Sequence, residues 1–472
     1  MTSDLYFRPS PDWVGDVIPF TDGDEIRLYY LYERRRTPKP GTPWHQAVTH
    51  DLVHYEDRGE ALSAGGVEDE DFNAYTGSIV RDDEGLFHLF YTANNPRRLA
   101  PGGRSLQLVA HATSVDARTW VKHPEDTFGA PEGYDPADWR DPYVYRTPDS
   151  PGWTMILAAR HQDGPDRRRG VVARLTSDDL TCWQIQEPLW DPHRFITQEC
   201  PEVFRIGQWW YLVYSEFSDR FTTRYRVARS SEGPWLAPER DTIDGRAFYA
   251  AKSVEWHGRR LFFGWIASRE GASDSGPWLW AGTMAALEAV QNPDGSLALR
   301  LPQEVLGAFA QPLDVDHGPA RLESRTGYSA RMLTDRLPDS ARVSLDLAWE
   351  EGTREVSVLL RADDSGEEGY VLRLEPLQSR MVLDRWPRRE PGTEQWHIAG
   401  DQPHFIELER PVDLSAGHAH LDLIMHGELF QCCLNNQVCL STSIYDHPSG
   451  RLGVAVLDGS LVIRSLDVLT RS

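Results

Sequence analysis

Three carboxylates stand in surroundings unlike an ordinary solvated surface. Asp16 lies inside an apolar run that reads WVGDVIPF over residues 13–20. Burying an unpaired carboxylate is unfavourable, so its place in this run needs a reason. Asp141 in DWRDPYVYR and Glu199 in TQECPEVF each come just before a strongly apolar stretch. The three acids therefore share a position relative to the elements that follow them.

Acids placed in this way could hydrolyse a glycosidic bond. One carboxyl group protonates the leaving oxygen, and a second attacks the anomeric carbon or activates water. The attacking carboxylate must be ionised, while the acid must keep its proton near neutral pH. A single such residue is more often a turn cap or the partner of an arginine, but three in the same phase favour a shared site.

An apolar strand pattern recurs five times in the first part of the chain, at intervals of about 50 to 65 residues. Most copies are followed by a small polar turn and an aromatic residue that begins the next strand. Each unit is too short to bury its own face, which is typical of blades arranged around an axis. The five segments are RLYYLYE from Arg27, FHLFYT from Phe87, WTMILAAR from Trp153, WWYLVYS from Trp209 and RLFFGWIA from Arg260.

The sequence predicts an all-β fold: a five-bladed β-propeller followed by a C-terminal β-sandwich. A chain of 472 residues exceeds the size of one hydrophobic core, so two domains are expected. The later segments alternate apolar and polar residues, as in a half-buried antiparallel sandwich. We expect the propeller over residues 1–295, a linker over 296–325 and the sandwich over 326–472. Blade geometry would then bring the three acids to one end of the axis.

Composition limits the partners and the compartment. A formal net charge of −23 argues against binding to nucleic acid or to an anionic membrane. No apolar run approaches the roughly 20 residues of a membrane helix, and the N-terminus shows no signal peptide. The five cysteines have no zinc-like spacing, so we expect a reduced, cytoplasmic protein without a metal or cofactor. The 17 tryptophans suit packing against the apolar faces of sugar rings, although aromatic residues also favour sheets.

Several motifs resemble the invertase and fructanase family, glycoside hydrolase family 32, and its clan relatives. WVGDVIP is similar to the family's Trp-Met-Asn-Asp-Pro-Asn-Gly motif, with Asp16 three positions after Trp13. Arg-Asp-Pro stands at residues 140–142 and Glu-Cys-Pro at 199–201. YTGSIV from Tyr75 looks like Phe-Ser-Gly-Ser, and GRAFYAAKS with FFGWIA resembles the Phe-Tyr-Ala-Ala and Gly-Trp stretches. The ordered set is more specific than any one of these motifs.

The resemblance implies a retaining, exo-acting hydrolase of small β-furanosides, similar to a β-fructofuranosidase. It makes Asp16 the nucleophile, Glu199 the general acid/base and Asp141 the group that holds ring hydroxyls. It also implies a small oligosaccharide as the partner, without a cofactor. The expected substrate contacts are Trp13, Trp44, Gln46, Tyr75, Thr76, Ser78, Arg140, Asp244 and Trp265.

The departures from the family pattern cluster at the positions that contact the sugar in the family. Gly15 and Ile18 replace the asparagines on either side of the nucleophile, and Leu31 replaces a glutamine. WHQA at residues 44–47 replaces Trp-Gly-His-Ala. Because a site that hydrogen-bonds a substrate hydroxyl discriminates strongly, these changes predict altered sugar contacts. An arabinofuranoside, an unusual fructoside, or transfer to a sugar hydroxyl instead of water would each fit.

Other interpretations stay open. In an inverting enzyme of the arabinanase type, Asp16 would be the base for water, and the carboxyl groups would lie about 6.5 to 9.5 Å apart instead of about 5 to 5.5 Å. A carbohydrate-binding protein without turnover, or a scaffold, is the non-enzymatic alternative. His418, His420 and His426 indicate a surface strand more than a metal site, and Lys252 fits packing as well as the active end. The sandwich could mediate a homodimer.

Overall fold

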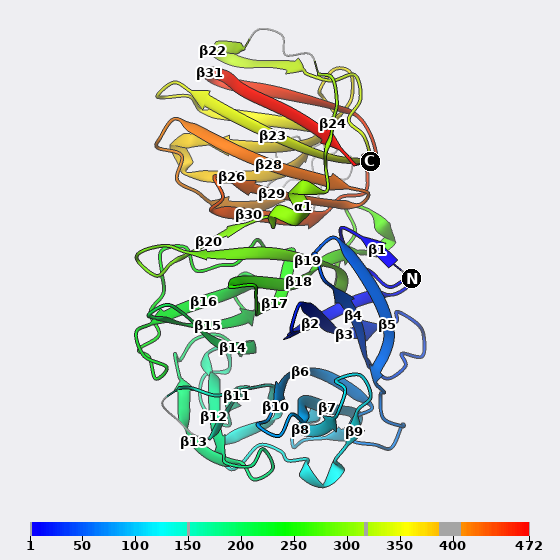
Figure 1. Cartoon of the computed structure of the whole chain (residues 1–472). Helices are drawn as coiled ribbons and strands as arrows, with labels where there is room; N and C mark the ends of the chain where they lie inside the picture. The colour runs from blue at the N-terminus through cyan, green and yellow to red at the C-terminus, as the bar shows by residue number, and fades with distance from the viewer. Residues whose placement is uncertain (1, 149–151, 316–319, 387–406, 472) are drawn as a thin grey trace. The chain divides into compact units, whose positions relative to one another are not determined.

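The computed structural model describes residues 2–148, 152–315, 320–386 and 407–471 (Figure 1). It is nearly all-β, with 59% of residues in strands and 4% in helices. The chain forms two compact units, residues 1–266 with 280–297 and residues 267–279 with 298–472. No helix among the described residues is long and apolar enough to cross a membrane.

The first unit is a five-bladed β-propeller, as predicted, and its blades are antiparallel meanders (Figure 1). The first blade holds β2 (Trp13–Asp22), β3 (Glu25–Glu33), β4 (Trp44–Thr49) and β5 (His54–Leu62), with β1 (Thr2–Asp4) beside β5. The second holds β6 (Asn73–Arg81), β7 (Phe87–Leu99), β8 (Ser105–Ser114) and β9 (Val121–Lys122). The third holds β10 (Tyr134–Tyr145), β11 (Trp153–His161), β12 (Gly170–Ser177) and β13 (Gln184–Trp190). The fourth holds β14 (Glu199–Ile206), β15 (Trp209–Glu216) and β16 (Thr222–Ala228), and the fifth holds β17 (Phe248–Trp256), β18 (Arg259–Arg269) and β19 (Trp278–Gln291).

The ring closes between the first and last blades. Val14 of β2 pairs with Gly282 of β19, so the strands of these two blades form one continuous sheet. Apolar residues fill the spaces between blades, as between the first two, where Tyr29 and Trp44 pack with Leu89 and Tyr91. The innermost strands β6, β10, β14 and β17 remain sheet edges, which the arrangement around the axis keeps short and protected.

Side chains tie the innermost strands to one another. Val144 N on β10 donates to Ser78 Oγ on β6 at 2.9 Å. Ser253 N on β17 donates to Glu202 Oε2 on β14 at 2.8 Å. These bonds fix the first strands of different blades relative to each other, and those strands carry the three candidate acids.

The second unit is a β-sandwich whose two layers share one long strand. The first half of β31 (Arg451–Thr470) pairs with β22 (Arg321–Met332) and β24 (Glu355–Ala362), and its second half pairs with β23 (Ser340–Trp349). β24 continues to β25 (Gly369–Glu375), β26 (Arg380–Trp386) and β27 (Leu408–Pro411). β23 continues to β28 (His418–His426), β29 (Leu429–Leu434) and β30 (Val438–Ser443).

The stretch 296–325, for which the sequence indicates a linker, contains regular structure. It holds β20 (Leu297–Arg300), α1 (Gln303–Gly307), β21 (Gln311–Pro312) and the start of β22. From residue 298 it belongs to the second unit. Four short 3-10 helices complete the elements: η1 (Pro124–Asp126), η2 (Asp166–Arg168), η3 (Glu270–Ala272) and η4 (Pro376–Gln378).

Candidate active site

All five innermost strands carry an irregularity near their start. A β-bulge of this kind bends a strand and re-aims a side chain, and such bulges are common next to active sites. Asp141 and Cys200 lie at two of these irregularities with positive φ, 59° and 50°. The pairing register shifts between Val14 and Val17, Tyr75 and Gly77, Arg140 and Tyr143, Glu199 and Glu202, and Tyr249 and Lys252.

The bulges surround a cavity of about 430 Å³ that contains all three candidate acids. Asp16 comes from β2, Asp141 from β10 and Glu199 from β14. Residues that are distant in the sequence thus meet at one end of the propeller axis. The rest of the lining is Leu31, Lys39, Tyr75, Thr76, Gln107, Arg140, Cys200, Phe217, Phe221, Tyr249 and Trp280.

Donors fix both carboxylate oxygens of Asp16. Thr76 Oγ1 donates to Oδ2 at 2.5 Å, and Trp265 Nε1 donates to Oδ1 at 2.9 Å. The Cys200 thiol lies 3.8 Å from Oδ2. Burial raises the pKa of Asp16, and the hydrogen bonds from Thr76 and Trp265 oppose that rise because they stabilise the ionised form. The carboxylate is therefore oriented and supported as an anion.

Asp141 is fixed through its backbone and its side chain. Its N–H donates to Thr92 Oγ1 at 2.8 Å, and its Oδ2 accepts a bond from Cys200 N at 2.9 Å. Burial raises the pKa of Asp141, while the charge of Arg140 opposes that rise. The rigid carboxylate lies in the cavity where hydroxyl groups of a sugar can donate to it.

Glu199 faces a phenol and a guanidinium. Tyr249 Oη donates to Oε2 at 2.6 Å, and Arg140 Nη2 donates to Oε1 at 3.2 Å. Arg140 also donates to Asp138 Oδ1 at 2.6 Å and to Gln107 Oε1 at 3.2 Å, so its plane is held from three sides. Burial raises the pKa of Glu199, although Arg140 opposes the rise. A raised pKa suits a group that must deliver a proton.

Four of the expected substrate contacts lie at or beside the acids. Tyr75, Thr76 and Arg140 line the cavity. Trp265 is fully buried behind Asp16 and contacts it through the indole N–H. Trp13 does not line the cavity, and the guanidinium of Arg35 stacks over its ring at 4.0 Å.

The structure places the other four expected contacts outside the cavity, in structural roles. Trp44 and Gln46 belong to β4, the third strand of its blade, and donate to backbone carbonyls of Ala74 and Ala117, each at 3.1 Å. Ser78 Oγ accepts the bond from Val144 described above. Asp244 is buried and accepts a bond from the N–H of the next residue, Gly245.

Several cavity residues have no motif that reveals them. Gln107 lies on β8, Lys39 between β3 and β4, and Phe217 and Phe221 between β15 and β16. Tyr249 belongs to the FYAAKS stretch, whose resemblance to a family motif was the one sequence feature that pointed to it. Among the described residues, no group of three or more histidine, cysteine or acidic side chains could hold a metal ion.

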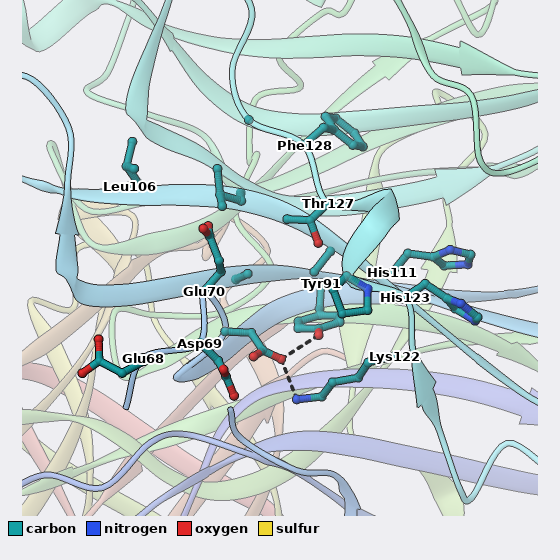
Figure 2. Close-up of a pocket in the computed structure, with 16 residues that line it drawn as sticks. Glu68, Asp69, Glu70, Tyr91, Leu106, His111, Lys122, His123, Thr127 and Phe128 are labelled. Carbon is teal, nitrogen blue, oxygen red and sulfur yellow. Dashed lines mark hydrogen bonds and ion pairs between the residues drawn. The ribbon is translucent and has the colours of Figure 1, made fainter. Parts of the chain in front are cut away.

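A larger cavity of about 760 Å³ lies in the second blade and has a different character (Figure 2). Lys122 Nζ and Tyr91 Oη donate to the carboxylate of Asp71 at 2.5 and 2.8 Å. In Figure 2, dashed lines lead from the labelled Lys122 and Tyr91 to one carboxylate. Glu68 pairs with Arg97 at 2.9 Å. This cavity contains none of the three candidate acids, which all line the smaller cavity.

Comparisons with known proteins show which family this chain belongs to. The family model described as "Glycosyl hydrolases family 32 N-terminal domain" matches residues 7–300. The chain is 27% identical to sucrose-6-phosphate hydrolase of Escherichia coli, over 96% of this chain and 92% of that protein. It is 28% identical to raffinose invertase of Escherichia coli, over 66% of this chain and 67% of that protein.

Solved structures share the fold at low sequence identity. Exo-inulinase from Aspergillus awamori matches with a TM-score of 0.75 and 17% identity, over 100% of this chain and 99% of that chain. Fructan 1-exohydrolase IIa from Cichorium intybus matches with a TM-score of 0.77 and 16% identity, over 100% and 97%. With the family model covering the whole propeller and the three carboxylates in one cavity, this chain belongs to glycoside hydrolase family 32.

Proposed function

We propose that this glycoside hydrolase removes the terminal β-fructofuranosyl unit from small oligosaccharides such as sucrose, with retention of configuration. The observation that carries the proposal is the meeting of Asp16, Asp141 and Glu199 in one cavity, each with a different set of partners. The names of the related invertase and hydrolases support the fructosyl specificity.

The proposed hydrolysis is a two-step displacement. As Asp16 attacks the anomeric carbon, Glu199 transfers its proton to the leaving oxygen, and the bond between that oxygen and the anomeric carbon breaks. Glu199 then removes a proton from water, whose oxygen attacks the same carbon and releases Asp16. Two inversions at one carbon give net retention. A sugar hydroxyl in place of water would give transfer.

Asp141 and Arg140 would hold the sugar during these steps. Asp141 is only 4% exposed, so a hydroxyl that donates to it replaces little bulk water. Hydrogen bonds to an ionised partner in such a site are about twice as strong as neutral ones. Arg140 links this carboxylate region to Glu199 and thereby keeps the acid near the leaving oxygen.

The charge of the cavity favours a neutral leaving group. Lys39 pairs with Glu33 at 3.0 Å, and Arg140 faces Asp138 and Glu199. The two cations that line the cavity are thus matched by carboxylates, and a phosphate would also meet the two further acids of the lining, Asp16 and Asp141. We expect kcat/KM for sucrose to exceed that for sucrose 6-phosphate. The opposite order would assign the chain to phosphorylated substrates.

Product analysis tests the proposal directly. Wild-type protein and Asp16→Ala are incubated with sucrose, raffinose, short fructans and an arabinofuranoside, and the sugars are separated by chromatography. We expect free fructose from the wild type and none from the variant. Methanol added as acceptor should yield methyl β-fructofuranoside, whereas the α-anomer would indicate inversion. Binding of these sugars without turnover would support a carbohydrate-binding protein instead.

Two expectations about the whole chain stay predictions. Association of two copies through the sandwich is measured by light scattering of the full chain. A cytoplasmic location is measured by fractionation of cells that express it.

A further inference from the structure

A tightly packed contact lies beside Asp16 and involves Gly15, Leu31 and Trp280. Leu31 lies on β3 between the partners of Val14 and Val17, opposite the bulge that holds Gly15 and Asp16. A Cβ atom on Gly15 would lie 2.5 Å from Cη2 of Trp280 and 3.0 Å from Cβ of Leu31. Carbon atoms in contact are normally about 3.5 to 4.0 Å apart. The indole therefore fills the space that any side chain at position 15 would need.

Trp280 is held firmly in this place. Arg35 Nη2 donates to the carbonyls of Trp280 and Ala281, at 2.8 and 3.1 Å. Two residues further on, Gly282 pairs with Val14. The ring of Trp280 meets Trp265 edge to face at 6.2 Å between centroids, and Trp265 donates to Asp16. The indole and the candidate nucleophile thus share one support.

Exposure shows which end of the cavity Trp280 occupies. Leu31, Asp141 and Cys200 at its base are 1%, 4% and 3% exposed. Trp280 and Phe217 are 36% and 40% exposed, so part of each ring faces the open end. The side chain of Lys39, whose Nζ lies 5.5 Å from the Trp280 ring centroid, is 52% exposed. A sugar whose anomeric carbon reaches Asp16 must leave its other half against these residues.

We propose that Trp280 is the residue that selects the leaving group, which lies with its apolar C–H or aryl face on the indole, and that Gly15 makes room for this platform. The inference rests on the proposed fructosyl hydrolysis and adds how the departing half is bound. Stacking depends on a flat apolar surface more than on particular hydroxyls. The enzyme should therefore accept pyranosyl and aryl leaving groups and bind a small alkoxy group poorly.

The first test compares three β-D-fructofuranosides: sucrose, the phenyl compound and the methyl compound. Trp280→Ala should lower kcat/KM for sucrose and the phenyl compound by about ten- to a hundredfold, mainly through KM, because both lose an apolar contact surface. The methyl compound should change less than about threefold, since its leaving group is too small to cover the ring. Trp280→Phe should restore most of the loss.

The second test is a double-mutant cycle between positions 15 and 280. Gly15→Ala displaces the indole, so in the wild-type background it should reproduce the loss seen for Trp280→Ala. In the Trp280→Ala background the contact with the indole is gone and only the 3.0 Å approach to Leu31 Cβ remains, so the same substitution should lower kcat/KM for sucrose much less than it does in the wild type. Far-UV circular dichroism checks that each variant folds. If Gly15→Ala alone does not fold, the double variant can still be compared with Trp280→Ala.

The outcomes separate this inference from the proposed function. If the wild type releases no fructose from any of the three compounds, the proposed function is wrong. If the wild type is active but Trp280→Ala lowers kcat/KM equally for all three, Trp280 only supports Asp16 and the platform is wrong. Equal losses from Gly15→Ala in both backgrounds would likewise contradict the packing of Gly15 against Trp280.

Discussion

The proton on Glu199 is controlled by the two donors that face its carboxylate. Burial raises the pKa of Glu199, and the hydrogen bond from Tyr249 partly opposes that rise because it favours the ionised form. The bond therefore limits how far burial raises the pKa of this acid. The same phenol stacks on Phe221 at 4.0 Å between ring centroids, which fixes its direction.

Tyr249→Phe should move the alkaline limb of the pH profile upward. Without the phenol, the pKa of Glu199 rises further, and an acid that must hold its proton then stays active to higher pH. We expect a shift of about half to one pH unit in kcat/KM for sucrose. Tyr91→Phe, which removes a similar bond to Asp71 in the other cavity, is the control. A shift to lower pH would contradict this account.

Single residues could be predicted where a motif fixes their neighbours. Asp141 and Glu199 stand in short, distinctive motifs, and the structure places both in the cavity. Trp280 could not be predicted, because its role depends on the absent side chain at Gly15, more than 250 positions away along the chain. The sequence shows each of these two residues but not their contact.

At the scale of elements, the innermost strands depend on a buried cation. Lys252 on β17 is 2% exposed, and its Nζ donates to the carbonyl of Gly77 on β6 at 2.9 Å. Its charge also opposes the rise in the pKa values of Asp16 and Asp141. One lysine thus joins two blades and favours two anions.

Lys252→Met should weaken both the link between the two blades and the stabilisation of the ionised carboxylates. Leaving the Gly77 carbonyl unpaired should lower the free energy of unfolding by about 1 to 3 kcal/mol. The pKa of Asp16 should rise, and because a nucleophile must be ionised, the acid limb of kcat/KM should move to higher pH. Urea unfolding and pH profiles measure the two effects. Lys122→Met, which removes an ion pair far from the three acids, should leave the profile unchanged.

A histidine on β28 links the stability of the sandwich to pH. Hydrogen bonds to Asp422 at 3.2 Å and Asp346 at 2.9 Å raise the pKa of His420 from 6.5 to about 9. A folded state that binds a proton more tightly than the unfolded chain is stabilised below the unfolded pKa. This contribution is complete below pH 6.5 and is lost as the pH rises through about 9.

His420→Gln should therefore destabilise the sandwich at pH 6 and have little effect at pH 10. Urea unfolding of the full chain at both pH values measures this. His418→Gln is the matched control, since His418 is exposed and its Nδ1 lies 3.0 Å from the carbonyl of Ala416. Equal destabilisation by His420→Gln at both pH values would mean that the ion pairs contribute nothing.

The strands themselves could be predicted, but not which face of a strand each side chain lies on near the cavity. Alternation along a strand assigns each side chain to a face, and a bulge reverses that assignment. At the bulge in β6, Tyr75 and Thr76 line the cavity, whereas Ser78, which follows the bulge, contacts β10. The expected contacts Trp44 and Gln46 do not line the cavity, because they belong to β4, which is two strands away from the innermost strand of its blade.

For the whole molecule, the five-fold repeat was readable because each blade needs a similar buried strand. The change from continuous apolar strands to alternating ones led us to expect the propeller to end at residue 295, and the first unit of the structure comprises residues 1–266 and 280–297. What the pattern did not show is that the stretch after residue 295 carries β20, α1 and β21. Short elements contribute too few residues to leave a periodic signal.

The accessibility of thiols tests the packing of the whole chain. Cys182 is exposed, and the other four cysteines are buried. Burial also raises the pKa of Cys200, which keeps it as an unreactive thiol. Ellman's reagent at pH 8 should modify one thiol in the folded protein, without loss of activity, and all five in urea. Rapid inactivation would show that Cys200 is reached from the cavity.

Closure of the ring between β2 and β19 has a consequence for folding during synthesis on the ribosome. Asp16 on β2 is synthesised before Trp265 and Tyr249, which support Asp16 and Glu199 and belong to the last blade. A nascent chain interrupted before that blade would carry all three acids and no working site. The site is therefore completed in one late folding step, when β2 pairs with β19.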